Sequence, residues 1–270
     1  EAGVFAPSFV SIGDLFAGAL IPGLLLVLGY GIYVVLFASS RPDDVPSNKE
    51  LILEQDRGKM LMNVAKGLLP PVTLVLAVLG SILKGVATPT EAASVGAVGA
   101  ILLAIIKRNI SFNVLQEVSL ETMRTTSMIY LILIGATIFS SVFRGFGGED
   151  LIESFLTALP GGILSATFVV MVFIFLLGFI LDFIEITFMV VPIVGPVLLG
   201  MGIDPIWLGV MIAINLQTSF LTPPFGFSLF YLRSVLPDTV DTSQIYRGVA
   251  PFIVIQILIL LLIALQPGIA

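Results

Sequence analysis

Residues 179–229 read FILDFIEITFMVVPIVGPVLLGMGIDPIWLGVMIAINLQTSFLTPPFGFSL and are almost wholly apolar. A run of this length and composition predicts helices inside a lipid bilayer. Prolines interrupt it twice, in segment 192–196 and in the TPP turn at 222–224. Unpaired backbone N–H and C=O groups are costly in hydrocarbon, so a membrane helix is broken only where those groups face protein or a polar cavity. The two breaks therefore predict the place where an ion or solute binds.

The composition of the whole chain bounds the class of protein. Of its 270 residues 57% are hydrophobic and 11% are charged, and the net charge is -6. A soluble domain carries about 25% charged residues, so we expect an all-α polytopic membrane protein in contact with lipid. The absence of Cys and His excludes disulfides, thiolate zinc sites and imidazole acid–base chemistry. A coupling ion would have to be held by oxygen atoms, and nothing in the composition predicts a nucleic-acid partner.

The apolar runs predict a series of spans joined by short connections. The loop at 39–60 carries the largest cluster of basic residues, which assigns it to the cytoplasm. Segment 113–126, NVLQEVSLETMRTT, is amphipathic and is expected at the interface, before a separate span at 127–143. The chain is accordingly divided into three parts: a first transmembrane helix and cytoplasmic loop at 1–60, helices with a TPTEAA hairpin at 61–148, and an amphipathic helix, hairpin, TPP broken helix and terminal transmembrane helix at 149–270.

Segment 84–106, KGVATPTEAASVGAVGAILLAII, contains a turn followed by a capped helix start. Thr88 or Thr90 fits the N-cap, and Pro89 fits the first turn. Glu91 lies where the helix dipole favours an anion, so a capping role is expected, with ion or substrate binding as the alternative. Small residues after it predict close helix packing. A spanning pair of helices and a re-entrant hairpin both fit this segment.

Two carboxylates lie inside the apolar run. Asp182 and Glu185 are spaced i and i+3, on one face of a helix. Two ionised carboxylates this close inside the bilayer would be unfavourable in free energy, so the pair requires a bound cation, a proton or an interfacial position. A helix-end role and a Na⁺ or proton role are both open. The prolines in segment 192–196 predict a hairpin or an unwound link.

The TPP turn follows a helix expected over residues 208–220. This helix carries polar side chains toward the turn: Asn215, Gln217, Thr218 and Ser219. Because proline has no N–H, the carbonyls near Thr218 and Ser219 are expected to lose their helical partners. Free carbonyls and hydroxyls are what an unwound helix uses to bind Na⁺. The alternative is a structural kink whose hydroxyls bond to their own backbone.

Three segments together resemble the large membrane subunit (DctM-like) of tripartite ATP-independent periplasmic (TRAP) transporters: NLQTSFLTPPFGFSLFYLR, GVATPTEAASVGA and LGFILDFIEITFMVVPIVGP. The resemblance runs through nearly the whole chain and is to the C-terminal half of that subunit. It implies an elevator-type secondary transporter of two inverted repeats, of which this chain is expected to hold one. It also implies a Na⁺ gradient as driving force, a small membrane (Q) subunit, a periplasmic substrate-binding (P) protein, an organic acid substrate and the bacterial inner membrane.

The resemblance further implies a Na⁺ site where the TPP turn meets the end of the preceding span. Its expected ligands are carbonyl or hydroxyl oxygens of Ser219, Thr222 and Phe225, with Gly178 facing them. Where this chain has Ser219, the family often has Gly. Weaker candidates complete the expected set: Thr218, Asn215 and Asp182.

Other functions fit the residues less well. An intramembrane aspartyl protease needs two facing aspartates, and only Asp182 qualifies by depth. A channel-like or structural membrane subunit, or another ion-coupled anion transporter, is the alternative. The chain has no GxxxxGK[ST] loop, so no ATP coupling is expected in it. We expect no enzyme activity but Na⁺-coupled uptake of a small organic acid.

Overall fold

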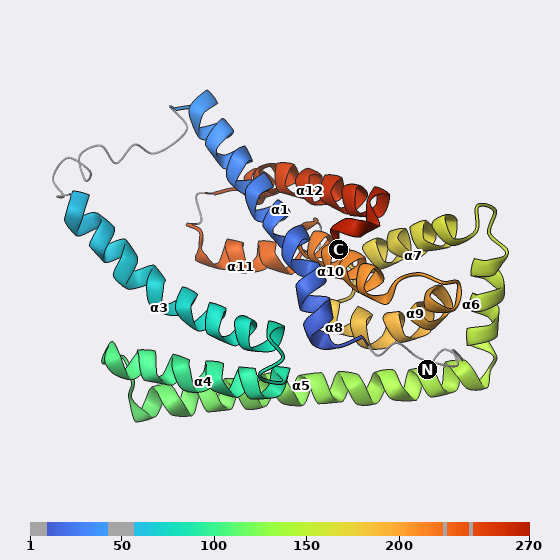
Figure 1. Cartoon of the computed structure of the whole chain (residues 1–270), viewed down its shortest axis with the longest axis horizontal. Coiled ribbons are helices and arrows are strands. Elements are labelled where there is room, and N and C mark those ends of the chain that lie inside the picture. The colour runs from blue at the N-terminus through green and yellow to red at the C-terminus, as the bar shows by residue number, and fades with distance from the viewer. Residues whose placement is uncertain (1–9, 43–56, 224–225, 238–239) are drawn as a thin grey trace. The chain divides into compact units, whose positions relative to one another are not determined.

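The computed structural model describes residues 10–42, 57–223, 226–237 and 240–270 (Figure 1). All regular elements in these ranges are helices. In chain order they are α1 (Ile12–Ser40), α3 (Arg57–Leu83), α4 (Pro89–Ile106), α5 (Phe112–Gly145), α6 (Gly148–Thr157), α7 (Ile163–Leu177), α8 (Phe183–Glu185), the π-helix η1 (Ile186–Val190), α9 (Val191–Gly200), α10 (Pro205–Leu221), α11 (Phe227–Val235), α12 (Thr242–Leu265) and the 3₁₀-helix η2 (Pro267–Ile269).

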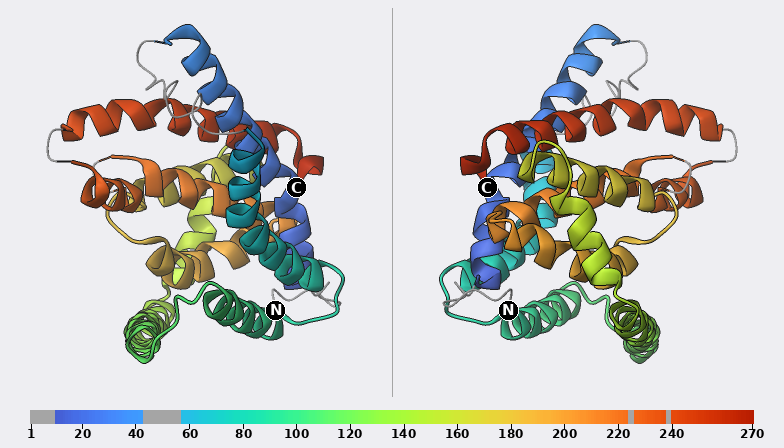
Figure 2. Two further views of the ribbon diagram at one scale, coloured as in Figure 1. Left: turned by 90° about the vertical axis from the view of Figure 1, so that its left-hand side faces the viewer. Right: turned by 90° about the vertical axis from the view of Figure 1, so that its right-hand side faces the viewer.

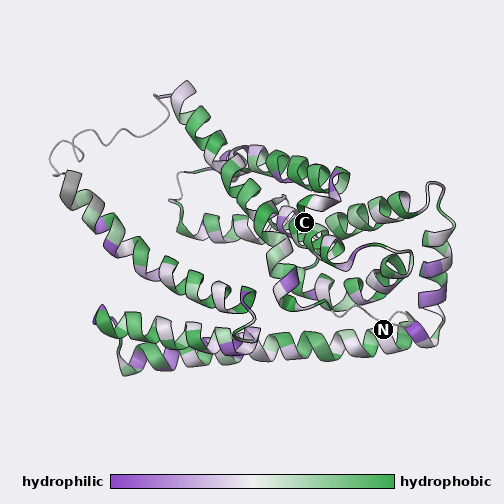
Figure 3. Cartoon of the chain, in the orientation of Figure 1, coloured by the Kyte–Doolittle hydropathy of each residue, from purple (hydrophilic) through white to green (hydrophobic). Residues whose placement is uncertain are grey.

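Six helices of the described chain are long and apolar enough to cross a membrane. They are α1, α3 from Met62, α4, α5, the run Phe183–Gly200 and α12, while α7 and α10 are shorter apolar helices. Hydrophobic residues cover most of α7 and α12 (Figure 3). The prediction of an all-α polytopic membrane protein is confirmed.

The described residues fold as two compact units, each considered by itself. The smaller unit comprises residues 11–17 and 31–122, and the larger unit residues 18–30 and 123–270. In the smaller unit α3 and α4 pack together as a helical hairpin. A β-carbon on Gly99 of α4 would lie 2.3 Å from Leu74 Cδ1 of α3, so a small residue is what lets the two backbones approach. Pro70 and Pro71 lie within α3, which continues through them.

The start of α4 shows the expected cap, and Thr88 rather than Thr90 provides it. The Glu91 N–H donates to Thr88 Oγ1 at 3.4 Å, and the Thr88 N–H and Oγ1 donate to Glu91 Oε2 at 2.8 and 2.9 Å. These bonds form a capping box that satisfies donors the helix cannot pair internally. The contacts of Glu91 therefore agree with the capping role expected from the sequence.

The cap predicts a difference between two substitutions at Thr88. Thr88→Ala removes the hydroxyl and is expected to lower the free energy of unfolding by about 1 kcal/mol, whereas Thr88→Ser keeps the cap and is expected to change it by only a few tenths. Chemical denaturation in detergent micelles measures both. Equal losses for Ala and Ser would show that the hydroxyl does not stabilise this helix.

In the larger unit α10 packs against α7 and against α12 (Figures 1 and 2). The core of this unit includes Ile174 of α7, Ile263 of α12 and Leu198 of α9, all fully buried. Asp204 caps α10 by accepting the Trp207 N–H at 2.9 Å, and Pro205 follows it as the first residue of the helix. Trp207 Nε1 then donates to the Ile263 carbonyl at 3.0 Å, which ties the first turn of α10 to the end of α12.

The first break in the apolar run lies upstream of the place predicted from proline. Helix α7 ends at Leu177, a turn follows, and Asp182 caps α8. The prediction of a hairpin or unwound link at 192–196 is wrong, because Pro192 and Pro196 lie inside α9. Pro192 occupies the first turn, where its missing N–H costs little, and the π-helical turn before it shifts the bonding pattern so that the Val191 N–H reaches the Ile186 carbonyl.

Helix α5 also differs from the expectation. The sequence predicts an interfacial segment at 113–126 and a separate span, whereas α5 runs without interruption over Phe112–Gly145. No proline occurs in this range, so nothing in the backbone forces a break between the polar and apolar halves. A change of hydropathy along a helix does not by itself end the helix.

Candidate functional site

The C-terminal ends of α7 and α10 meet at Gly178 and Ser219. A β-carbon on Gly178 would lie 2.2 Å from Ser219 Cβ and 2.5 Å from Ser219 Oγ, so any larger residue would collide there. Ser219 is 2% exposed. Its Oγ donates to the Asn215 carbonyl at 3.0 Å and lies 3.5 Å from the Phe175 carbonyl. The absence of a side chain at Gly178 thus brings oxygens from two helices together.

A cavity of about 10 Å³ lies at this crossing, lined by Gly178, Leu181, Phe183, Ile186, Leu216, Ser219 and Phe220. A cavity of about 10–15 Å³ holds one water-sized ligand. The space therefore suits a single small ion or water and no organic solute.

The hydroxyls near the TPP turn all bond to backbone. Thr218 Oγ1 donates to the Ile214 carbonyl at 2.8 Å, and Thr222 Oγ1 donates to the Thr218 carbonyl at 2.7 Å. The Thr222 N–H donates to the Ser219 carbonyl at 3.0 Å. The expectation of free carbonyls at Thr218 and Ser219 is therefore wrong, because Thr222 supplies donors in place of the lost helical ones. Each of these oxygens still has a lone pair that a cation could use.

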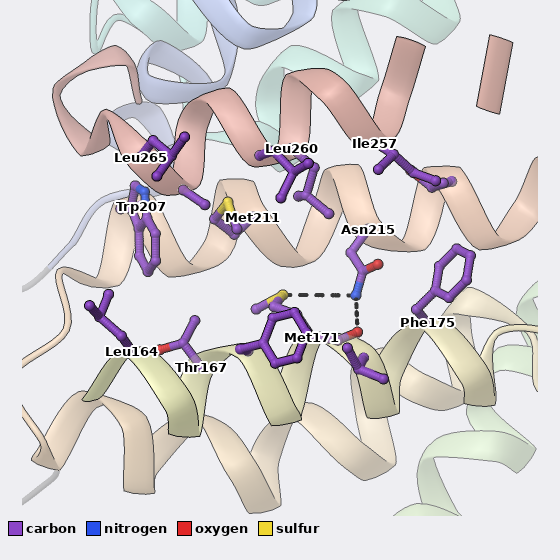
Figure 4. A pocket seen from close by; sticks show the side chains of 15 residues that line it. Leu164, Thr167, Met171, Phe175, Trp207, Met211, Asn215, Ile257, Leu260 and Leu265 are labelled. Carbon is purple, nitrogen blue, oxygen red and sulfur yellow. Dashed lines mark hydrogen bonds between the residues drawn. The ribbon is translucent and has the colours of Figure 1, made fainter. Parts of the chain in front are cut away.

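The Asn215 side chain joins α10 to α7. It is 1% exposed, and its Nδ2 donates to the Met171 carbonyl at 2.7 Å and lies 3.8 Å from Met171 Sδ (Figure 4). This bond holds α10 on α7 one turn before Ser219. The Asn215 hydrogen bond thus stabilises the packing of α10 on α7 next to the crossing of Gly178 and Ser219.

Gln217 does not join the other polar residues of α10. Two residues on a helix differ by about 200°, so Gln217 faces away from Asn215. Gln217 is exposed and lines a cavity of about 390 Å³ with Phe183, Thr187, Ala213, Leu216 and Phe220. The expectation that it lies with Asn215, Thr218 and Ser219 is wrong for this reason.

Asp182 serves as the start of a helix. Its Oδ1 accepts the Phe183 N–H at 2.7 Å, and the residue is partly buried. This contact agrees with the helix-end interpretation. Phe225, the remaining expected ligand, lies outside the described residues. The structure thus brings Gly178 and Ser219 together, and it places Asn215 and Thr218 on the buried side of α10.

Sequence reasoning did not single out Gly226 or Thr187. A β-carbon on Gly226 would lie 2.9 Å from the Phe220 carbonyl oxygen and 3.1 Å from that of Thr222, so the chain after the prolines folds back on these carbonyls. The glycine two residues after the double proline was a signal for such a close approach. Thr187 lies in the π-helix η1, for which the sequence offers no pattern.

A further groove, of about 370 Å³, lies between α7, α10 and α12 (Figure 4). Apolar side chains form most of its lining. Its polar residues Thr167, Asn215 and Thr218 donate to backbone carbonyls. A carboxylate placed there would meet no free donor from these side chains, so the groove does not suit an organic acid.

Comparison with known proteins gives matches along nearly the whole chain. The family model described as "Tripartite ATP-independent periplasmic transporter, DctM component" matches residues 3–269. The sialic acid TRAP transporter large permease protein SiaM of Vibrio cholerae is 30% identical over 271 residues, which cover 96% of this chain and 59% of that protein. The C4-dicarboxylate TRAP transporter large permease protein DctM of Pseudomonas aeruginosa is 29% identical over 266 residues, covering 98% and 60%.

A putative TRAP transporter large permease protein of Haemophilus influenzae is 29% identical over 261 residues, covering 96% of this chain and 62% of that protein. The chain thus spans about 60% of the length of these relatives. The family is a transport component, which excludes the intramembrane protease considered above. Because the family model covers almost every residue, the chain belongs to the DctM component family of tripartite ATP-independent periplasmic transporters.

Proposed function

We propose that the chain takes part in Na⁺-coupled uptake of a small organic acid across the bacterial inner membrane. Its partners would be a small membrane (Q) subunit and a periplasmic substrate-binding (P) protein. The observation that carries this proposal is the crossing of Gly178 and Ser219, where two interrupted helices leave a cavity the size of one ion. Family membership supports it, and two relatives are named as permeases for sialic acid and for C4-dicarboxylates.

Neutral oxygens would bind the Na⁺. The first candidate ligands are carbonyls and hydroxyls of Ser219 and Thr222. Phe225, which follows them in the sequence, is a further candidate, and Gly178 leaves room for the ion because it has no side chain. In the described chain no group of three or more Asp, Glu, His and Cys side chains is placed to hold a metal ion. A site of neutral oxygens suits a monovalent hard cation better than a divalent one, whose charge calls for carboxylates.

The solute would bind on the other side of the Phe183–Phe220 ring pair. These rings meet edge to face, with centroids 6.2 Å apart. Both rings, with Leu216, line the ion-sized cavity and also the 390 Å³ cavity where Gln217 offers an amide donor. An ion in the first cavity would therefore fix part of the wall of the second, which is a physical route for coupling. We propose that an elevator movement of this part of the protein carries both ligands.

Uptake into proteoliposomes tests this function. The full membrane complex would be given a panel of radiolabelled organic acids, with and without Na⁺ and with and without the binding protein. We expect saturable uptake that requires both additions. Flux that is indifferent to both would contradict the carrier and favour a channel-like subunit.

A further inference from the structure

Two polar side chains lie near the place where the membrane helices α1 and α12 contact each other. Tyr30 and Gln256 each lie more than two helical turns from the ends of their helices. Gln256 is 0% exposed, and neither its Oε1 nor its Nε2 has a hydrogen-bond partner. The Tyr30 hydroxyl is likewise buried without a partner.

The surrounding contacts hold these groups close. The Tyr30 ring meets the Phe252 ring edge to face, with centroids 5.1 Å apart, and Phe252 precedes Gln256 by one helical turn. Beside Tyr30, a β-carbon on Gly29 would lie 2.8 Å from Ile255 Cγ2, so α1 and α12 approach tightly here. Side chains held at such a crossing have little freedom to seek other partners.

Unpaired polar groups are costly in a bilayer, where no water replaces the missing partner. A phenol and a carboxamide are complementary, because the hydroxyl donates to Oε1 or accepts from Nε2. We propose that Tyr30 and Gln256 hydrogen-bond to each other across the crossing, and that this bond joins residues 18–30 of α1 to α12 as one moving unit. The first half of the proposal concerns stability alone, and the second rests on the transport function proposed above.

A double-mutant cycle tests the bond. In the purified membrane complex, Tyr30→Phe and Gln256→Leu are each expected to lower the melting temperature by about 2–4 °C, since each leaves one polar partner unpaired. The double variant is expected to be no less stable than the worse single variant, because it leaves neither group unpaired. As control, Tyr130→Phe removes an exposed hydroxyl from α5, and its effect should add to that of Gln256→Leu.

Single variants as stable as the wild type, or losses that add fully in the double variant, would overturn the bond. The movement is tested by a disulfide cross-link between two introduced cysteines, with which no other residue of these 270 can compete, since they include no cysteine. Gly29→Cys with Ile255→Cys places two thiols at the tight crossing. Oxidation is expected to leave uptake within about twofold of the reduced protein, since a bond inside one moving unit restrains nothing that must separate.

Uptake that is present under reduction and lost on oxidation would contradict the joint movement. Absence of uptake in the reduced wild-type complex would instead count against the proposed transport function, and the melting-temperature cycle would still decide the bond.

Discussion

Gly178→Ala is expected to lower the free energy of unfolding by about 1–3 kcal/mol, the cost of overpacking a tightly packed site. The new β-carbon would lie 2.2 Å from Ser219 Cβ, and that atom is fixed to the backbone of α10. The two helices must therefore separate. Because the ion-sized cavity lies at this crossing, uptake at subsaturating Na⁺ should be lost as well.

The matched rescue is the double variant Gly178→Ala with Ser219→Gly, which moves the side chain from one helix to the other. We expect it to recover most of the stability. The control is Gly135→Ala on α5, where an added β-carbon would have no neighbouring atom within 4 Å. Thermal unfolding and uptake measure all three. Stability of Gly178→Ala equal to that of Gly135→Ala would show that the crossing is looser than the structure places it.

Thr222→Ala is expected to raise the Na⁺ concentration for half-maximal uptake about tenfold, because an oxygen facing a charged ligand contributes roughly 1.5–3 kcal/mol. Thr222 also supplies the hydroxyl that occupies the Thr218 carbonyl. The maximal rate at saturating Na⁺ should change less, since the variant weakens binding of the ion and does not remove the solute contacts.

Thr222→Ser is the matched control, because it keeps the hydroxyl and removes only a methyl group. It should require Na⁺ within about twofold of the wild type, a difference of roughly 0.4 kcal/mol. Sodium titrations of initial uptake rates separate the variants. A Na⁺ requirement unchanged in Thr222→Ala would remove Thr222 from the ion site.

Local features of the chain were predictable from the sequence because their causes are local. The caps at Thr88 and Asp204 depend on residues within one turn. The long apolar runs likewise specify membrane helices by themselves. The close approach of Gly178 to Ser219 joins residues far apart in the chain, and the family resemblance rather than any local pattern indicated it.

The errors came from features that depend on tertiary context. Proline predicts a break only where its missing N–H is needed, and a π-helical turn before Pro192 removes that need. Polar residues close in sequence were grouped together, although Gln217 faces a different cavity from Asn215. Thr222 donates hydrogen bonds to the carbonyls near the TPP turn. Counting only the N–H groups that proline lacks therefore overestimates the number of free carbonyls.

Simultaneous entry of labelled Na⁺ and a labelled organic acid into proteoliposomes tests the proposed coupling most directly. The proteoliposomes would hold the full membrane complex, with the binding protein added outside. We expect the two labels to enter in a fixed ratio, and omission of either ligand to stop the entry of the other. Sodium entry without the acid, or acid entry without sodium, would contradict it.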